Sequence, residues 1–104
     1  MENERISELI RIIKTKPEIF IKNDTNKYSS YMYFFETLFI GIELCMEIKM
    51  ERLISSWYTK NIEIKPSNIS WFYFFEKQNQ DLSETDKIKL LLDTMDDFFS
   101  NYLQ

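Results

Sequence analysis

The chain has 104 residues, of which 44% are hydrophobic and 29% are charged, and its formal net charge is −4. This much apolar sequence excludes an intrinsically disordered chain, and the length predicts a single helical domain over residues 1–104. The sequence has no histidine, which excludes enzymes that depend on an imidazole base, a Cys–His dyad or a Ser–His–Asp triad.

The first predicted element is an amphipathic helix near the N-terminus. Its apolar residues, Ile6, Leu9, Ile10 and Ile13, recur at the spacing of one helix face. The pair Lys16–Pro17 ends this helix, because a residue that precedes proline disfavours the helical conformation. Pro17 is well suited to open a short further turn, and the polar residues 23–26 predict a loop.

The cellular location is predicted from three features. Residues 1–5 are acidic, where a signal peptide would be basic and then apolar. The single cysteine suits a reducing compartment. No uninterrupted apolar stretch reaches the ~20 residues that a membrane span needs. We therefore expect a cytoplasmic protein that does not contact a membrane.

Residues 27–58 predict one long helix. An apolar stripe near heptad spacing runs along it, and further apolar residues lie on the opposite side. A helix that is apolar nearly all round is usually central and covered by others. We therefore predict an all-α fold, an irregular bundle of four to five helices around this long helix, with a kink at Gly41. Cys45 lies in the stripe and is expected to be a buried structural thiol rather than a nucleophile.

Four carboxylates on this segment raise the question of a metal centre. They are Glu36, Glu43, Glu47 and Glu51. Carboxylate-bridged metal bundles also need a Glu-x-x-His motif, which a chain without histidine cannot supply. A solvated ridge is the favoured interpretation, and a magnesium site built from carboxylates alone is the alternative. We expect no metal and no cofactor.

Two shorter patterns follow. Residues 61–66 alternate polar and apolar side chains and predict an extended connector, after which Ser67 or Asn68 is expected to cap a helix through residues 71–75. Trp71 and Tyr73 are its expected surface anchors, because both side chains tolerate a wet edge. Residues 30–36 and 70–76 are identical at five of seven positions. A duplicated helical hairpin and chance similarity both remain open.

The net charge is concentrated at the end of the chain. Residues 1–75 carry ten acids and ten bases, whereas residues 76–104 carry seven acids and three bases. Such an asymmetry bears on the choice of partner rather than on the fold. The sequence pI of about 4.8 argues against direct binding to nucleic acid, whose protein partners are basic.

The last helix, which Ser83 is predicted to cap, places three of these acids together. Asp86, Asp93 and Asp97 fall within about 20° of one another at ~100° per residue, opposite the apolar side, with Leu90 among them. Like charges on one helix face repel, and local rules that are broken without local compensation often mark function. The candidate partner-binding residues are Glu84, Asp86, Leu90, Asp93, Asp96, Asp97, Trp71 and Tyr73. A solubilising acidic face with one exposed leucine is the alternative.

In size, acidity and lack of catalytic groups, the whole chain resembles the small acidic immunity proteins of bacterial contact-dependent growth inhibition and bacteriocin systems. Its composition also suits an AT-rich gene, because Ile, Lys and Asn make up 31 residues and Ala and Val are absent. The resemblance is one of overall character and assigns no residue roles.

The resemblance implies a non-enzymatic protein that binds and neutralises a toxin, often a nuclease, by covering its basic active site. Two alternatives remain open. One is a homo-oligomeric regulatory or structural helical protein, and a homodimer is compatible with the immunity hypothesis as well. The other is a phage anti-defence inhibitor.

Overall fold

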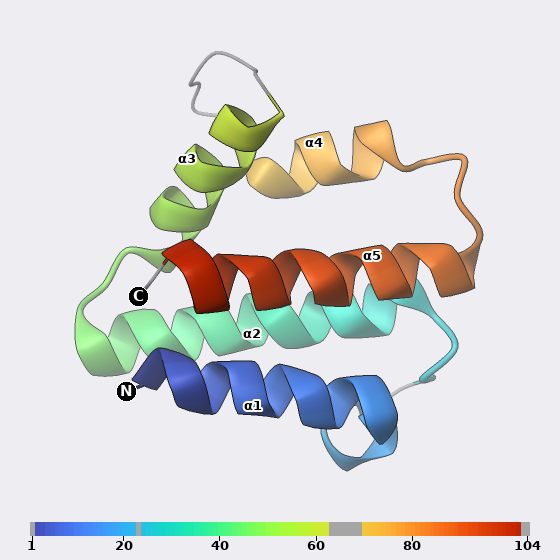
Figure 1. Cartoon of the computed structure of the whole chain (residues 1–104), viewed down its shortest axis with the longest axis horizontal. Helices are drawn as coiled ribbons and strands as arrows, with labels where there is room; N and C mark the ends of the chain where they lie inside the picture. The colour runs from blue at the N-terminus through green and yellow to red at the C-terminus, as the bar shows by residue number, and fades with distance from the viewer. Residues whose placement is uncertain (1, 23, 63–69, 103–104) are drawn as a thin grey trace. The chain divides into compact units, whose positions relative to one another are not determined.

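The computed structural model describes residues 2–22, 24–62 and 70–102. This part of the chain contains five α-helices, two short helical turns and no strand, which confirms the all-α prediction (Figure 1). The elements are, in chain order, α1 (Glu2–Thr15), the 3-10 turn η1 (Pro17–Ile19), α2 (Tyr28–Met46), α3 (Met50–Asn61), α4 (Trp71–Gln78), α5 (Glu84–Asp97) and the π-helical turn η2 (Phe98–Tyr102). None of the described helices has both the length and the apolar character of a membrane span.

The chain divides into two compact units, and α2 contributes to both. The first unit consists of Met1–Phe35 and Leu82–Gln104, and the second consists of Glu36–Asp81. Each unit has its own helix packing. The single domain expected from the length stays a prediction.

In the first unit, α5 and η2 pack against α1, and α1 and α5 run side by side in opposite directions (Figure 1). The expected apolar face of α1 is buried at Ile10 and Ile13, and that of α5 and η2 at Leu91, Leu92, Met95, Phe98 and Phe99. The helix α1 ends at Thr15, and Pro17 opens η1 at its first position. Both features agree with the proline rules used on the sequence.

Side-chain caps stabilise the starts of α5 and α2 in this unit. The Ser83 side chain accepts a hydrogen bond from the Asp86 backbone N–H at 3.2 Å, as predicted for the start of α5. One residue further on, Glu84 caps a different helix. Its Oε1 accepts the backbone N–H of Tyr28 at 2.8 Å, which satisfies a donor at the start of α2.

In the second unit, α3 packs against α4 around an aromatic cluster. The rings of Tyr58, Trp71 and Phe75 lie 5.7–6.0 Å apart between centroids, the edge-to-face range that favours aromatic pairs. The predicted caps Ser67 and Asn68 lie outside the described residues. The observed N-cap of α4 is Ser70, whose side chain accepts the Phe72 N–H at 3.3 Å.

The predicted long helix over 27–58 is wrong, because a break at residues 47–49 separates α2 from α3. Glu47 adopts a φ of 55°, in the left-handed region that non-glycine residues rarely occupy. Glu43 stabilises the new helix start, since its Oε2 accepts the Glu51 backbone N–H at 3.0 Å. The helix α2 continues through Gly41, so the break lies further on, and the kink at Gly41 stays a prediction.

Candidate functional site

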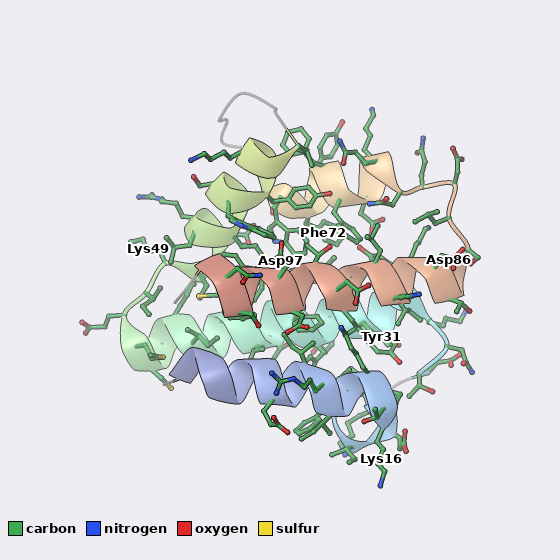
Figure 2. All side chains as sticks on the ribbon, in the orientation of Figure 1. Lys16, Tyr31, Lys49, Phe72, Asp86 and Asp97 are labelled. Atoms are coloured by element: carbon green, nitrogen blue, oxygen red, sulfur yellow. The ribbon has the colours of Figure 1, made fainter. Side chains whose placement is uncertain are left out.

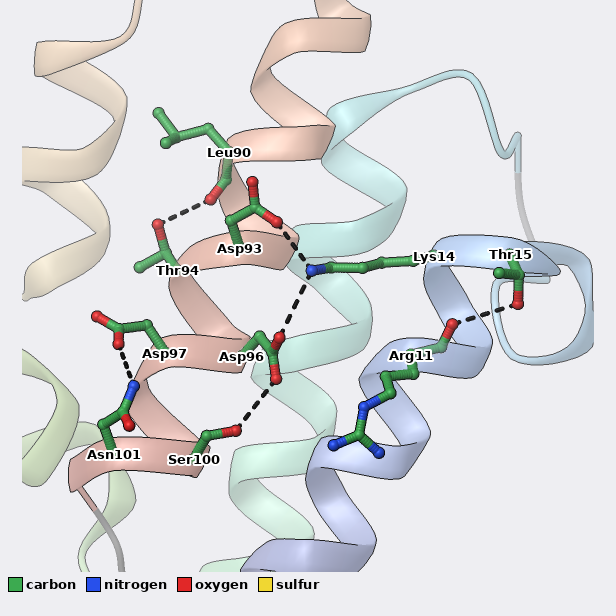
Figure 3. Close-up of polar contacts among 10 residues, drawn as sticks. All are labelled: Arg11, Lys14, Thr15, Leu90, Asp93, Thr94, Asp96, Asp97, Ser100 and Asn101. Carbon is green, nitrogen blue, oxygen red and sulfur yellow. Dashed lines mark hydrogen bonds and ion pairs between the residues drawn. The ribbon is translucent and has the colours of Figure 1, made fainter.

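The acidic face of α5 is compensated from α1 (Figure 3). Lys14 Nζ lies 2.8 Å from Asp93 Oδ1 and 3.5 Å from Asp96 Oδ2. Lys14 reaches these carboxylates because Ile10 and Ile13 bury the neighbouring face of α1 against α5. The expectation of an uncompensated row of acids is therefore wrong for the middle of this face.

The electrostatics of the pair follow from its geometry. The hydrogen bond that Lys14 donates to Asp93 raises the pKa of Lys14 above the 10.5 of an unperturbed lysine, and the negative charges of Asp93 and Asp96 raise it further. Partial burial opposes this shift, since removing the ammonium from water disfavours its charged form. Lys14 therefore stays protonated throughout the physiological range and holds two of the candidate carboxylates in ion pairs with α1.

The C-terminal end of the face is held by local hydrogen bonds. Asp96 Oδ1 accepts the Ser100 hydroxyl at 3.2 Å, and Asp97 Oδ1 accepts the side-chain amide of Asn101 (Figure 3). The helical chain also continues into η2, where Phe98 donates its backbone N–H to the carbonyls of Thr94 and Met95. Asp96 and Asp97 are therefore one turn away from the end of the helical chain, where the helix dipole disfavours a negative charge less than it does at the last turn.

Two exposed acids at opposite ends of α5 lie outside the Lys14 pair, Asp86 in the first turn and Asp97 in the last (Figure 2). Eleven residues of helix at 1.5 Å each separate them by roughly 16 Å. Leu90 lies between them with 36% of its surface exposed. These three residues, two separated charges around an apolar side chain, form the part of the predicted face that does not contact Lys14.

Glu84, another candidate residue, has a structural contact within the same unit. Its carboxylate accepts the backbone N–H of Tyr28, so a partner that binds Glu84 would compete with the cap of α2. Lys87 follows three residues further along α5, and its Nζ lies 5.8 Å from the centre of the Tyr28 ring. These contacts join the start of α5 to the start of α2 and position Asp86 on a fixed helix end.

The two aromatic candidates belong to the second unit and differ from each other. The prediction of Trp71 as a surface anchor is wrong, because only 2% of it is exposed, and its backbone N–H donates to Ser55 Oγ at 2.9 Å. A large ring gains more by packing against Tyr58 and Phe75 than by a wet edge. Tyr73, in contrast, is 48% exposed, and Lys77 Nζ lies 5.7 Å from its ring centre.

Two of the four carboxylates that the sequence offered to a metal accept hydrogen bonds from other parts of the chain. Glu43 caps α3, and Glu51 accepts a hydrogen bond from the Ser70 hydroxyl. Within the described residues, no group of three or more metal-ligating side chains is gathered. Cys45 is exposed rather than buried, since the break after α2 removes the continuous stripe on which its burial was predicted.

Sequence reasoning missed Lys14 as a member of the α5 face. The available signal was weak: Lys14 follows the buried Ile13 and therefore lies beside the apolar face of α1. Only the pairing of α1 with α5 identifies its partners.

In comparisons with known proteins, no family model, no curated protein and no solved structure matches this chain.

Proposed function

We propose that this protein is a non-enzymatic immunity protein, which acts in the cytoplasm by binding a basic toxin domain and covering its active site. The observation that carries the proposal is the part of the α5 face outside the Lys14 pair, where the exposed Asp86 and Asp97 flank Leu90, which is 36% exposed. Acidic groups speed the encounter with a basic cleft, and a buried apolar anchor supplies much of the affinity of such a complex.

The fixed geometry of this face supports the proposal further. The Lys14 ion pair, the Ser83 cap and the Asn101 contact hold α5 along its whole length. A surface that is already ordered loses little conformational entropy on binding. A nuclease is the toxin class favoured here, because its phosphate-binding cleft is basic.

The proposal is tested with the product of the adjacent gene, where a toxin would be encoded. Co-expression of this chain should restore growth to cells that express the toxin. In a binding assay at low salt, the double variant Asp86→Lys/Asp97→Lys should associate at least about tenfold more slowly, and its salt dependence should flatten.

A matched control makes the same change in charge elsewhere. Glu18 and Asp81 are both exposed and lie outside α5, so Glu18→Lys/Asp81→Lys should leave the association rate within about threefold of the original. Equal slowing of the two double variants would mean that only net charge matters. Full affinity of the Asp86→Lys/Asp97→Lys variant at low salt would exclude this face as the interface.

A further inference from the structure

Two strongly exposed apolar side chains of the second unit lie on one helix, α2, and one of them, Leu44, is the most exposed large hydrophobic residue of the described chain. Ile40 is 58% exposed and Leu44 is 79% exposed. With the exposed Thr37 they are spaced by three and four residues, and at ~100° per residue they fall within about 60° of one another. The buried Phe39 lies on the other side of α2. We call Thr37, Ile40 and Leu44 the α2 stripe.

This stripe differs from isolated surface leucines, which are ordinary. A spacing of three and four residues is the pattern by which helices pack against each other. Gly41 lies beside the stripe, and a Cβ built there would meet nothing within 4 Å. Glycine inside a helix costs about 1 kcal/mol relative to alanine. No contact among the described residues explains it, whereas the close approach of a second helix would.

We infer that the α2 stripe is a self-association surface, at which two copies of this chain pair through parallel α2 helices. This inference concerns another surface than the α5 face and does not depend on the proposed function. The stripe itself has no charged residue, so it suits an equally apolar stripe. Two acids lie beside the stripe, and Glu43 already accepts a hydrogen bond from the Glu51 N–H. Glu36 alone would provide little charge for the recognition of a basic partner.

The residues on the two flanks of the stripe determine whether the two α2 helices pair in parallel or antiparallel orientation. Glu36 and Glu43 lie on one side of it, whereas Gly41 and Cys45 lie on the other. In an antiparallel pair centred on Ile40, like flanks meet, so Glu36 of one copy would face Glu43 of the other. In a parallel pair, the acidic flank meets the uncharged flank. Parallel pairing therefore avoids the repulsion between like charges.

The size of the stripe sets the strength of the pair. The exposed surfaces of Ile40, Leu44 and their neighbours would bury on the order of 800 Å² in total over two copies, below the ~1,200 Å² of a standard interface. The dimer is accordingly weak and depends on concentration. Sedimentation equilibrium of the full chain from about 10 μM to about 1 mM should show the average mass rise from 12.7 kDa towards twice that value.

Substitutions in the stripe should dissociate this dimer. Ile40→Glu and Leu44→Glu should each raise the dissociation constant more than about tenfold, because a carboxylate would enter an apolar contact twice in each dimer. The matched control is Ile19→Glu, the same exchange at a residue that is 46% exposed in the other unit, and it should change the constant less than about twofold. A chain that is monomeric at every concentration, or equal effects of all three variants, would overturn the inference.

Two further measurements exclude other occupants and orientations. If Ile40→Glu or Leu44→Glu lowers the melting temperature of the monomer, the stripe is covered within the chain and the inference fails. In a Cys45→Ser background, mild oxidation should cross-link both Ile40→Cys and Leu44→Cys dimers when the helices are parallel. Cross-linking of Ile40→Cys alone indicates antiparallel helices and contradicts the proposed pairing.

Discussion

Replacement of Lys14 by methionine tests the ion pair that joins α1 to α5. Methionine keeps most of the apolar stem of lysine, so the change removes mainly the charge. The Lys14 side chain is 34% exposed and faces two carboxylates, at 2.8 and 3.5 Å. Exposed ion pairs contribute ~0.2–1 kcal/mol after screening by solvent, and a second carboxylate places this one near the upper limit. We expect Lys14→Met to lower the free energy of unfolding by about 1 kcal/mol.

The pH dependence of this loss has a definite sign. Folding raises the pKa of Lys14, so the ion pair contributes fully below the 10.5 of an unperturbed lysine and its contribution disappears as the pH rises through the higher folded value. The stability difference between the original chain and Lys14→Met should therefore be constant near neutral pH and should vanish above that pKa.

Urea unfolding followed by tryptophan fluorescence, at about pH 7 and again above the folded pKa of Lys14, measures both quantities. Lys22→Met is the control, because Lys22 is exposed, and it should change the free energy of unfolding by less than ~0.5 kcal/mol. In a double-mutant cycle, Asp93→Asn should cost less in the Lys14→Met background than in the original. Equal stability of Lys14→Met and the original at neutral pH, or a difference that persists at high pH, would refute this account.

Three other substitutions test separate features. Trp71→Ala should cost ~3–5 kcal/mol in urea unfolding, because the ring is buried, whereas Tyr73→Ala should cost less than ~1 kcal/mol; similar losses would contradict the assignment of one ring to the core and the other to the surface. Glu47→Gly should raise the melting temperature by a few degrees, because glycine relieves the φ of 55°, and a decrease would argue against the left-handed turn. Leu90→Ala should leave the melting temperature within about 3 °C of the original and raise the dissociation rate of the toxin complex; a large loss of stability would place Leu90 in the core.

Local signals predicted several elements of this fold because their causes lie within a few residues. Pro17 ends one helix and opens the next turn, and Ser83 caps α5 through the N–H of Asp86. The break between α2 and α3 has no such signal, since neither glycine nor proline occurs at residues 47–49. There the cap comes from the Glu43 side chain eight residues before Glu51, and a pattern of apolar periodicity cannot detect it.

The candidate site also contains residues that local periodicity predicted and residues whose burial only the packing decided. Periodicity along α5 placed Asp86, Asp93 and Asp97 on the polar side, and the structure leaves all three exposed there, with Asp93 paired to Lys14. Which aromatic ring in residues 71–75 would be buried could not be predicted, because five consecutive aromatics point in every direction around a helix. Trp71 is a buried ring because it packs against Tyr58 of α3 and its backbone N–H donates to Ser55 of the same helix.

The sequence by itself determined the helical class, the boundaries at Pro17 and Ser83, and the acidic excess of the last helix, since composition and near-neighbour geometry control these properties. Only the tertiary structure decided which acids are neutralised. Asp93 and Asp96 meet Lys14 because α1 and α5 pack side by side, and an ion pair between distant residues depends on distances that packing creates. The same packing leaves Asp86, Leu90 and Asp97 as the part of the face outside the Lys14 pair.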